Sequence, residues 1–311
     1  MAAIQVKDGM DTLKNSARPR ITNRLLTYHS GMYRLIVAVL LTVASAQPPV
    51  WWPEGPCGMS PYPDAGDACP IGEPCVSPQI VGGIIARDNE FPWQVSVRDA
   101  DGHKCGGVLL NDRWVISAAT CTNGLNPGEL IVVLGAINRT DPGSAYNTVA
   151  IFEHELYDAS NYDNDLTLIK TTDNIAMSEL VVPICAPDPS ESYEGYDAEA
   201  SGWGTLSSGG QTPDELRYTT LRTINNTLCQ DLFPGNEVTS GMICAGDGGS
   251  YQDRDTCQGD AGGPLGWKNG QGQYVLIGLT SWGISCAAGY PGVYTRVSQF
   301  SNWITEKMEK N

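Results

Sequence analysis

The stretch DTCQGDAGGPLGW, residues 255–267, surrounds Ala261 with carboxylates, a cysteine, paired glycines and a proline. Such a set could serve a reactive side chain at its centre. The methyl group of Ala261, however, can neither attack a bond nor bind a metal. Any chemistry in this stretch therefore depends on groups other than its central side chain.

A general base would most often be a histidine, and the chain has only three: His29, His103 in DADGHKCGG and His154 in IFEHELY. None of them lies in a motif that would deliver it to a catalytic site. We expect each to be structural or exposed to solvent.

Cysteine count and charge limit the function classes. The ten cysteines are an even number without the close C-x-x-C pairs of a zinc site, which indicates disulfides and an oxidising compartment. The formal net charge is −16, so a phosphate backbone or an anionic membrane surface would be repelled. Nucleic acid and heparin-like polyanions are excluded as partners on this ground.

An export signal is predicted at residues 32–46, MYRLIVAVLLTVASA, with a basic start, an apolar run and a small-x-small end. It is too short to span a bilayer, and a type II membrane anchor is the alternative. Residues 1–31 are a mis-assigned start or a long n-region. Cleavage after residue 46 removes six basic and two acidic residues, so the mature secreted chain has a net charge of −20 and no membrane segment.

Residues 47–79 contain nine prolines, three cysteines and no Lys or Arg, which predicts an extended pro-segment. From residue 80 to residue 311, short β-rich runs alternate with turn residues, as in WQVSVR, LIVVLG, LTLIKT and YVLIGLTSW. This pattern favours an all-β sandwich or barrel. Only the C-terminal tail is predicted to be helical, with Phe300, Trp303, Ile304 and Met308 on one face and Ser298 as its cap.

Six motifs then appear in order along the chain: IVGG at 80–83, WVISAATC at 114–121, DNDLTLIK at 163–170, GDAGGP at 259–264, SWG at 281–283 and PGVYTRV at 291–297. Together they resemble the trypsin-like, chymotrypsin-fold serine proteases over residues 80–311. The resemblance implies two antiparallel six-stranded β-barrels, with the site in the cleft between them and a C-terminal helix.

That family needs a histidine, an aspartate and a serine, in this chain order. The aspartate matches Asp165, but Thr120 stands at the histidine position and Ala261 at the serine position. A threonine hydroxyl does not exchange a proton near neutral pH, and an alanine cannot form an acyl intermediate. The resemblance therefore implies a pseudoprotease in which no triad is intact. Ser281 is expected to form a satisfied polar cluster with Asp165 and Thr120.

The resemblance also implies that the binding features have survived. The amides of Gly259 and Ala261 match the oxyanion hole, which does not depend on the missing hydroxyl. Asp255 matches the pocket-floor carboxylate that gives trypsin-like members their preference for Arg and Lys, and Gly283 and Gly292 match the pocket walls. The alternative is that Asp255 is an inherited feature without a present ligand.

The activation site departs from the family pattern, because Gln79 stands where trypsin-like zymogens carry Arg or Lys before the residue that matches Ile80. If this bond were cut, the new amino group of Ile80 would pair with Asp260 and order the pocket. The resemblance also implies cysteine pairs. The expected pairs are Cys105 with Cys121, Cys229 with Cys244, Cys257 with Cys286, and Cys185 with one of Cys57, Cys69 and Cys75.

Two N-x-T triplets, at Asn138 and Asn225, predict glycosylation on surface loops. The calcium loop of the family begins with a glutamate where this chain has Ala136, so no metal and no cofactor are expected.

Three functions remain open. The first is a secreted, non-catalytic binding module, which acts on an extracellular protein or basic peptide as a decoy or as a cofactor in a cascade such as immunity or clotting. The second is a structural or adhesive extracellular protein that reuses the fold. The third is a residual serine endopeptidase, which the missing serine and histidine make the weakest of the three.

Overall fold

The structure is a computed structural model that describes residues 55–62 and 83–311. Several predictions lie outside these residues: the signal peptide 32–46, His29, most of the pro-segment 47–79, Cys69, Cys75, Gln79 and Ile80. They stay predictions. No helix in the described ranges is long and apolar enough to cross a membrane.

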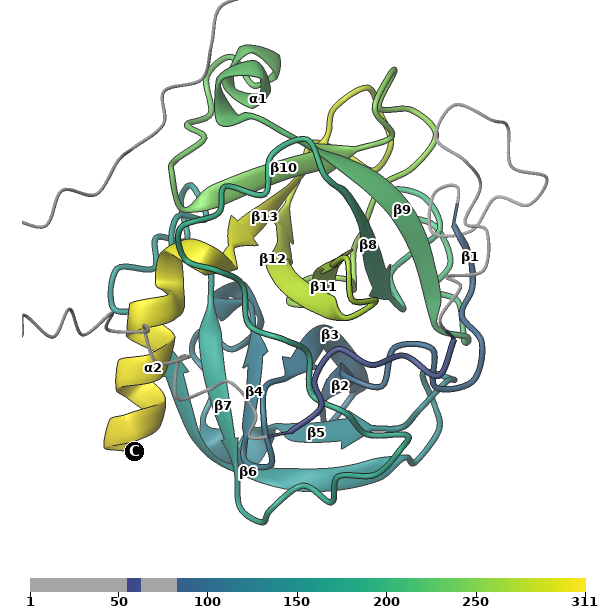
Figure 1. The fold of residues 1–311 in the computed structure, drawn as a ribbon, viewed down its shortest axis with the longest axis vertical. Helices are drawn as coiled ribbons and strands as arrows, with labels where there is room; N and C mark the ends of the chain where they lie inside the picture. Colours follow the sequence, from purple (N-terminus) through teal and green to yellow (C-terminus); the bar gives the residue numbers. More distant parts are fainter. Residues whose placement is uncertain (1–54, 63–82) are drawn as a thin grey trace, which may run out of the picture. The chain divides into compact units, whose positions relative to one another are not determined.

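The first half of the domain is a closed, antiparallel six-stranded barrel, drawn in blue and teal in Figure 1. Its strands follow one another around the barrel in the order β2-β3-β4-β7-β6-β5, and β5 closes it on β2. Their bounds are β2 Gln94–Asp99, β3 Gly102–Leu109, β4 Trp114–Ser117, β5 Ile131–Leu134, β6 Ser144–Glu153 and β7 Thr167–Thr171.

The second half repeats this architecture in green and yellow (Figure 1). Its strands follow the order β9-β10-β13-β12-β11-β8, and pairing of β8 with β9 closes the barrel. The bounds are β8 Asp197–Gly202, β9 Arg217–Ile224, β10 Met242–Gly246, β11 Pro264–Lys268, β12 Tyr274–Trp282 and β13 Gly292–Arg296. The short β1, Ile84–Ile85, pairs with Arg217 and Tyr218 at the start of β9. The predicted fold of two six-stranded barrels is confirmed.

The barrels are filled by the β-branched and aliphatic residues of the predicted runs. Val95 and Val97 of β2, Val115 and Ile116 of β4 and Leu168 of β7 are all fully buried in one core cluster. Burying such a side chain contributes about 1.5–3 kcal/mol. A second cluster fills the other barrel.

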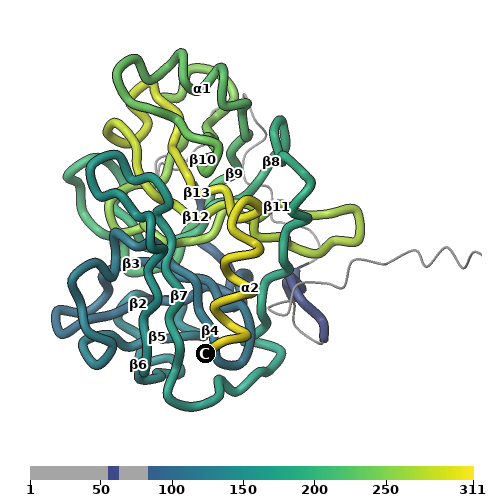
Figure 2. The backbone as a smooth tube through the Cα atoms, turned by 90° about the vertical axis from the view of Figure 1, so that its left-hand side faces the viewer, coloured from purple at the N-terminus to yellow at the C-terminus, as the bar shows by residue number. Residues whose placement is uncertain are grey.

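Two α-helices accompany the barrels in the described residues, and the sequence predicts only one of them. Helix α2, Ser301–Lys310, begins beside β13 and runs down along the first barrel, as Figures 1 and 2 both show. Its Ile304 and Met308 are buried. The expected cap was wrong: Ser298 lies in a 3₁₀ turn, Val297–Phe300, and helix α2 begins after it without a side-chain cap.

The unpredicted helix is α1, Asn226–Leu232, which is too short for its periodicity to show. Asn225 caps it, since its side-chain oxygen accepts a hydrogen bond from the Leu228 amide at 2.8 Å.

Disulfides tie the described elements together. They join Cys57 to Cys185, Cys105 to Cys121, Cys229 to Cys244, and Cys257 to Cys286. The sequence leaves the disulfide partner of Cys185 open, and the structure shows that this partner is Cys57.

Residues 55–62 of the predicted pro-segment lie against the second barrel. Gly58 donates its amide to the Pro183 carbonyl and accepts a bond from the Tyr274 amide, both at 2.8 Å. Its φ is +60°, and a Cβ there would lie 2.2 Å from the Tyr274 carbonyl oxygen, so only glycine fits. The segment is thus held by backbone hydrogen bonds as well as by its disulfide.

Candidate active site and specificity pocket

Asp165 lies two residues before the start of β7 and is completely buried. One carboxylate oxygen accepts the Thr120 amide at 2.8 Å, and the other accepts the Ser281 hydroxyl at 2.6 Å. Burial raises the pKa of Asp165 to about 6, and these hydrogen bonds oppose the shift. The structure therefore brings Asp165, Thr120 and Ser281 together, but Thr120 contributes its backbone rather than its hydroxyl.

Ala261 lies in a tight loop that is pressed against the first barrel. The Gly106 amide of β3 donates to the Ala261 carbonyl at 2.9 Å. The following residue, Gly262, has φ +77°, and a Cβ there would lie 2.1 Å from the Ser117 hydroxyl. Glycine is thus required beside Ala261, whatever side chain position 261 carries.

A cavity of about 320 Å³ opens next to these positions. The predicted residues that line it are Thr120, Asp255, Gly259, Ala261, Ser281, Gly283 and Gly292. Asp165 and Asp260 are buried behind its wall and do not line it. The cavity therefore joins Thr120 and Ala261, two of the predicted triad positions, to the predicted pocket.

Asp255 is only 3% exposed and its two oxygens accept backbone amides, from Thr256 at 2.8 Å and from Ala287 at 3.0 Å. Burial raises the pKa of Asp255 to about 7, and the nearby carboxylates of Asp260 and Asp247 add to the rise. No cation offsets this charge among the described residues. A cationic ligand in the cavity would supply the missing partner.

The two glycines of the pocket wall differ in how much space a side chain would have. A Cβ at Gly292 would lie 2.7 Å from a carboxylate oxygen of Asp255, whereas a Cβ at Gly283 would have nothing closer than 3.7 Å. A side chain at position 292 would thus displace the pocket carboxylate.

Six residues that line the cavity were not singled out from the sequence: Tyr162, Thr256, Gln258, Thr280, Trp282 and Ser285. The Thr256 hydroxyl forms a 3.0 Å hydrogen bond with the Tyr294 hydroxyl. Tyr162 stacks on Trp282 at the cavity wall, with ring centroids 6.5 Å apart and planes 22° apart. Thr256 and Trp282 adjoin quoted motif positions, so their place in the chain was the available signal.

His103 touches the loop from the other side, which the sequence also did not indicate. Its Nε2 lies 3.2 Å from the Gly259 carbonyl and its Nδ1 lies 2.8 Å from the Ser96 hydroxyl. Burial lowers the pKa of His103 to about 4, so the ring is neutral near pH 7. It does not line the cavity. His103 therefore supports the loop and is not part of the cavity wall.

Asp260 is fully buried and accepts amides from Gly204 at 2.7 Å and Cys257 at 2.8 Å. Burial raises the pKa of Asp260 to about 6. A Cβ at Gly202 or Gly204 would lie 2.1 or 2.3 Å from its oxygens, so two glycines make room for the carboxylate.

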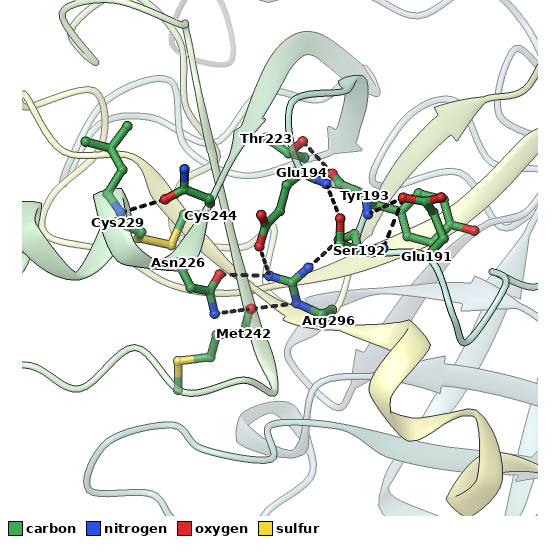
Figure 3. Close-up of polar contacts among 12 residues, drawn as sticks. Glu191, Ser192, Tyr193, Glu194, Thr223, Asn226, Cys229, Met242, Cys244 and Arg296 are labelled. Carbon is green, nitrogen blue, oxygen red and sulfur yellow. Dashed lines mark hydrogen bonds and ion pairs between the residues drawn. A yellow bond between two sulfur atoms is a disulfide. The ribbon is translucent and has the colours of Figure 1, made fainter.

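Arg296 is the last residue of β13, whose first residue is the pocket-wall glycine Gly292. Figure 3 shows the polar contacts of Arg296. Its guanidinium donates to the Met242 carbonyl at 3.0 Å, to the Asn226 side chain at 2.8 Å and to the Ser192 carbonyl, and it pairs with Glu194 at 3.5 Å. Burial lowers the pKa of Arg296. These bonds join β10, β13, helix α1 and the loop before β8, and they thereby fix the strand that carries a pocket wall.

The remaining predicted positions are peripheral. Asn225 is exposed, whereas Asn138 is partly buried and its side-chain amide bonds to Asp141 at 3.3 Å. No group of three or more His, Cys, Asp or Glu residues in the described part of the chain could hold a metal ion.

Comparison with known proteins agrees with this geometry. The family model described as Trypsin matches residues 80–304. The chain belongs to the trypsin family. The family members in the next comparison are proteases by name, and their similarity extends over most of this chain.

Trypsin-1 of Astacus astacus is 37% identical over 238 residues, which cover 72% of this chain and 98% of that protein. Transmembrane protease serine 9 of Rattus norvegicus is 36% identical over 250 residues, or 78% of this chain and 23% of that protein. Serine protease filzig of Drosophila melanogaster is 32% identical over 268 residues, or 81% of this chain and 15% of that protein. The chain thus spans less than a quarter of the last two relatives.

Proposed function

We propose that this chain is a secreted, non-catalytic member of the trypsin family that binds a basic side chain of an extracellular protein or peptide. In this role it acts as a decoy or as a regulatory cofactor in an extracellular proteolytic or immune cascade. The observation that carries the proposal is a buried Asp255 at the floor of an open cavity whose reactive positions hold Thr120 and Ala261.

The loss of chemistry follows from these two side chains. Removing the nucleophile or the base of such a triad costs about a millionfold in turnover. A replacement base is not at hand in the described residues, because His103 bonds to the outer side of the loop and His154 packs against Phe300 and Trp303. Asp165 has both oxygens occupied by hydrogen bonds.

Binding does not need the missing groups. A guanidinium or amidine would pair with the Asp255 carboxylate and leave the surrounding water. Ground-state binding of this kind is independent of the nucleophile. The net charge of −20 after signal removal adds a long-range attraction for cations. A structural or adhesive role is the second candidate, and it requires no ligand in the cavity.

Activity assays on Arg and Lys esters and peptides test the first half of the proposal. We expect no turnover from the purified chain once contaminating proteases are inhibited. Thr120→His together with Ala261→Ser, in a Gln79→Arg background cut by trypsin, should gain activity, and the single changes should not. Turnover by the unaltered chain that copurifies with it would refute the proposal.

Titration of benzamidine by calorimetry tests the second half. It should be done on the intact chain and on the Gln79→Arg form after cleavage, since an ordered pocket depends on the Ile80 amino group in this family. Binding that Asp255→Asn abolishes supports the proposal. If neither form binds, or if Asp255→Asn binds equally well, the adhesive or structural role is favoured.

A further inference from the structure

Two arginines of the first barrel have no ionic partner. Arg98 is on β2, and Arg139 is in the loop between β5 and β6. None of the ion pairs among the described residues includes either of them, and neither lines the cavity that holds Asp255. Acidic residues outnumber basic ones by 35 to 19 in this chain, so two unpaired arginines that lie close together need an explanation.

The guanidinium groups of the two arginines are also incompletely hydrogen bonded. Arg98 donates from Nε to the Ser96 hydroxyl at 3.0 Å, but its Nη2 is buried without a hydrogen-bond partner among the described residues. The Nε of Arg139 is buried without a partner in the same part of the chain. Buried donors are rarely left unsatisfied in folded proteins. Both residues are only half-buried, so a ligand with acceptor oxygens can reach their guanidinium groups from solvent.

The two positive charges act on each other. Burial lowers the pKa of Arg98 and the charge of Arg139 lowers it further, whereas the charge of Asp141 opposes the fall. Both arginines add to the effect of burial that lowers the pKa of His103 to about 4, so this ring is neutral and adds no third charge. An anion that binds between the two arginines would remove the repulsion between them.

The backbone that carries the pair is fixed before any ligand binds. The Arg139 amide donates to the Asp214 carbonyl at 2.6 Å, and the Leu216 amide donates to the Ile137 carbonyl at 2.7 Å. Arg98 lies between β3 and β5, with which its strand pairs on either side. Binding an anion therefore orders side chains only, which reduces its entropic cost.

The acidic surroundings select the kind of anion. Asp141 acts on Arg98 but is occupied within its own turn, where its oxygens accept the Asn138 amide at 2.9 Å and the Asn138 side chain at 3.3 Å. With this carboxylate close by and a strongly acidic chain around it, a polymer with many negative charges would be repelled. A single carboxylate brings one charge and accepts two parallel hydrogen bonds from a guanidinium.

We infer that Arg98 and Arg139 form a binding site for one Glu or Asp side chain of a protein partner. The site is distinct from the cavity at Asp255 and takes a ligand of the opposite charge. It goes beyond the proposed function and does not depend on it.

The test compares two peptides on the secreted chain: acetyl-Gly-Glu-Gly-amide, which carries one carboxylate, and acetyl-Gly-Gln-Gly-amide, which has the same shape without the charge. Nitrogen-15 NMR follows the side-chain Nε–H signals of the arginines during each titration. At low salt the Glu peptide should bind about tenfold more tightly than the Gln peptide and shift the signals of Arg98 and Arg139. Equal affinities of the two peptides overturn the inference.

Matched variants locate the carboxylate. Arg98→Gln and Arg139→Gln each remove one charge and should each lose most of the preference for the Glu peptide. Arg139 lies in a loop, so its variant stays informative if the change on β2 destabilises the barrel. Arg222→Gln is the control and should keep the preference, because Arg222 is exposed on β9 and pairs with Asp197 at 2.8 Å. A preference that survives in both test variants, or that the control loses equally, overturns the inference.

Two competitors separate this site from the alternatives. A heparin hexasaccharide should not displace the Glu peptide, and displacement would overturn the assignment to a protein carboxylate. Saturating benzamidine should leave the preference unchanged, because neither arginine lines the cavity that holds Asp255. Competition by benzamidine would place the carboxylate in that cavity and overturn the inference. Failure of benzamidine to bind counts against the proposed function alone.

Discussion

The raised pKa of Asp255 predicts that the proposed binding of a cation in the pocket depends on pH. The empty pocket holds this carboxyl with a pKa of about 7, chiefly because it is buried. A bound amidine or guanidinium stabilises the charged form and lowers that pKa. Binding therefore releases a proton below pH 7, and the affinity rises with pH until the empty carboxyl is fully ionised.

The size of the effect follows from the charged fraction of Asp255. With a pKa of about 7, this fraction is about nine tenths at pH 8, one half at pH 7 and one tenth at pH 6. The affinity for benzamidine should fall about tenfold from pH 8 to pH 6, which corresponds to about 1.4 kcal/mol. Benzamidine keeps its own charge throughout this range, so the change reports on the protein.

Calorimetry in two buffers of different ionisation enthalpy measures both the affinity and the protons released. We expect about half a proton to be released per ligand at pH 7. Neutral benzamide is the ligand control and should bind without a rise toward pH 8. An affinity for benzamidine that stays constant or increases as the pH falls from 8 to 6 would refute the assignment of Asp255 as the buried, raised-pKa partner.

Three further predictions concern the pocket wall and the supports of the domain. Gly292→Ala should weaken benzamidine at least about tenfold, because its Cβ would lie 2.7 Å from the pocket carboxylate, whereas Gly283→Ala should change the affinity little; titration of both variants compares them. Arg296→Met removes four hydrogen-bonded contacts and should lower the free energy of unfolding by about 2 kcal/mol, measured by urea denaturation; an unchanged midpoint would contradict this. Replacing both Cys57 and Cys185 by serine opens a loop with a sequence separation of 128, and should cost about 4 kcal/mol in the same assay without altering the pocket affinity.

The strands that the sequence predicts are those with continuous β-branched runs. β12, Tyr274–Trp282, coincides with the predicted run YVLIGLTSW, and β7, Thr167–Thr171, begins one residue after the start of the predicted run LTLIKT. The missed strands carry weak signals. β3 begins with Gly102 and two exposed or half-exposed polar residues, and β8 buries only alanines and a glycine on its inner side. In these strands pairing with neighbours, rather than side-chain pattern, determines the conformation.

The sequence likewise predicts some features of the candidate site and misses others. Ordered motifs place Asp165, Asp255 and Ala261 in one region, since each lies at a recognisable position. They do not show that Thr120 bonds through its amide, or that His103 supports the loop from outside the cavity. They also do not reveal that the pKa of Asp255 is raised to about 7, because burial depends on residues that are distant in the sequence.

The contacts that stabilise the loop around position 261 do not use the side chain of that residue. The Ala261 carbonyl bonds to the Gly106 amide, and the Asp260 carboxylate bonds to two backbone amides. The disulfide from Cys257 to Cys286 ties the same loop to the pocket wall. None of these contacts involves the side chain at position 261 or position 120. The loop and the carboxylate of Asp255 are therefore held in place by contacts that are independent of the side chains at positions 120 and 261.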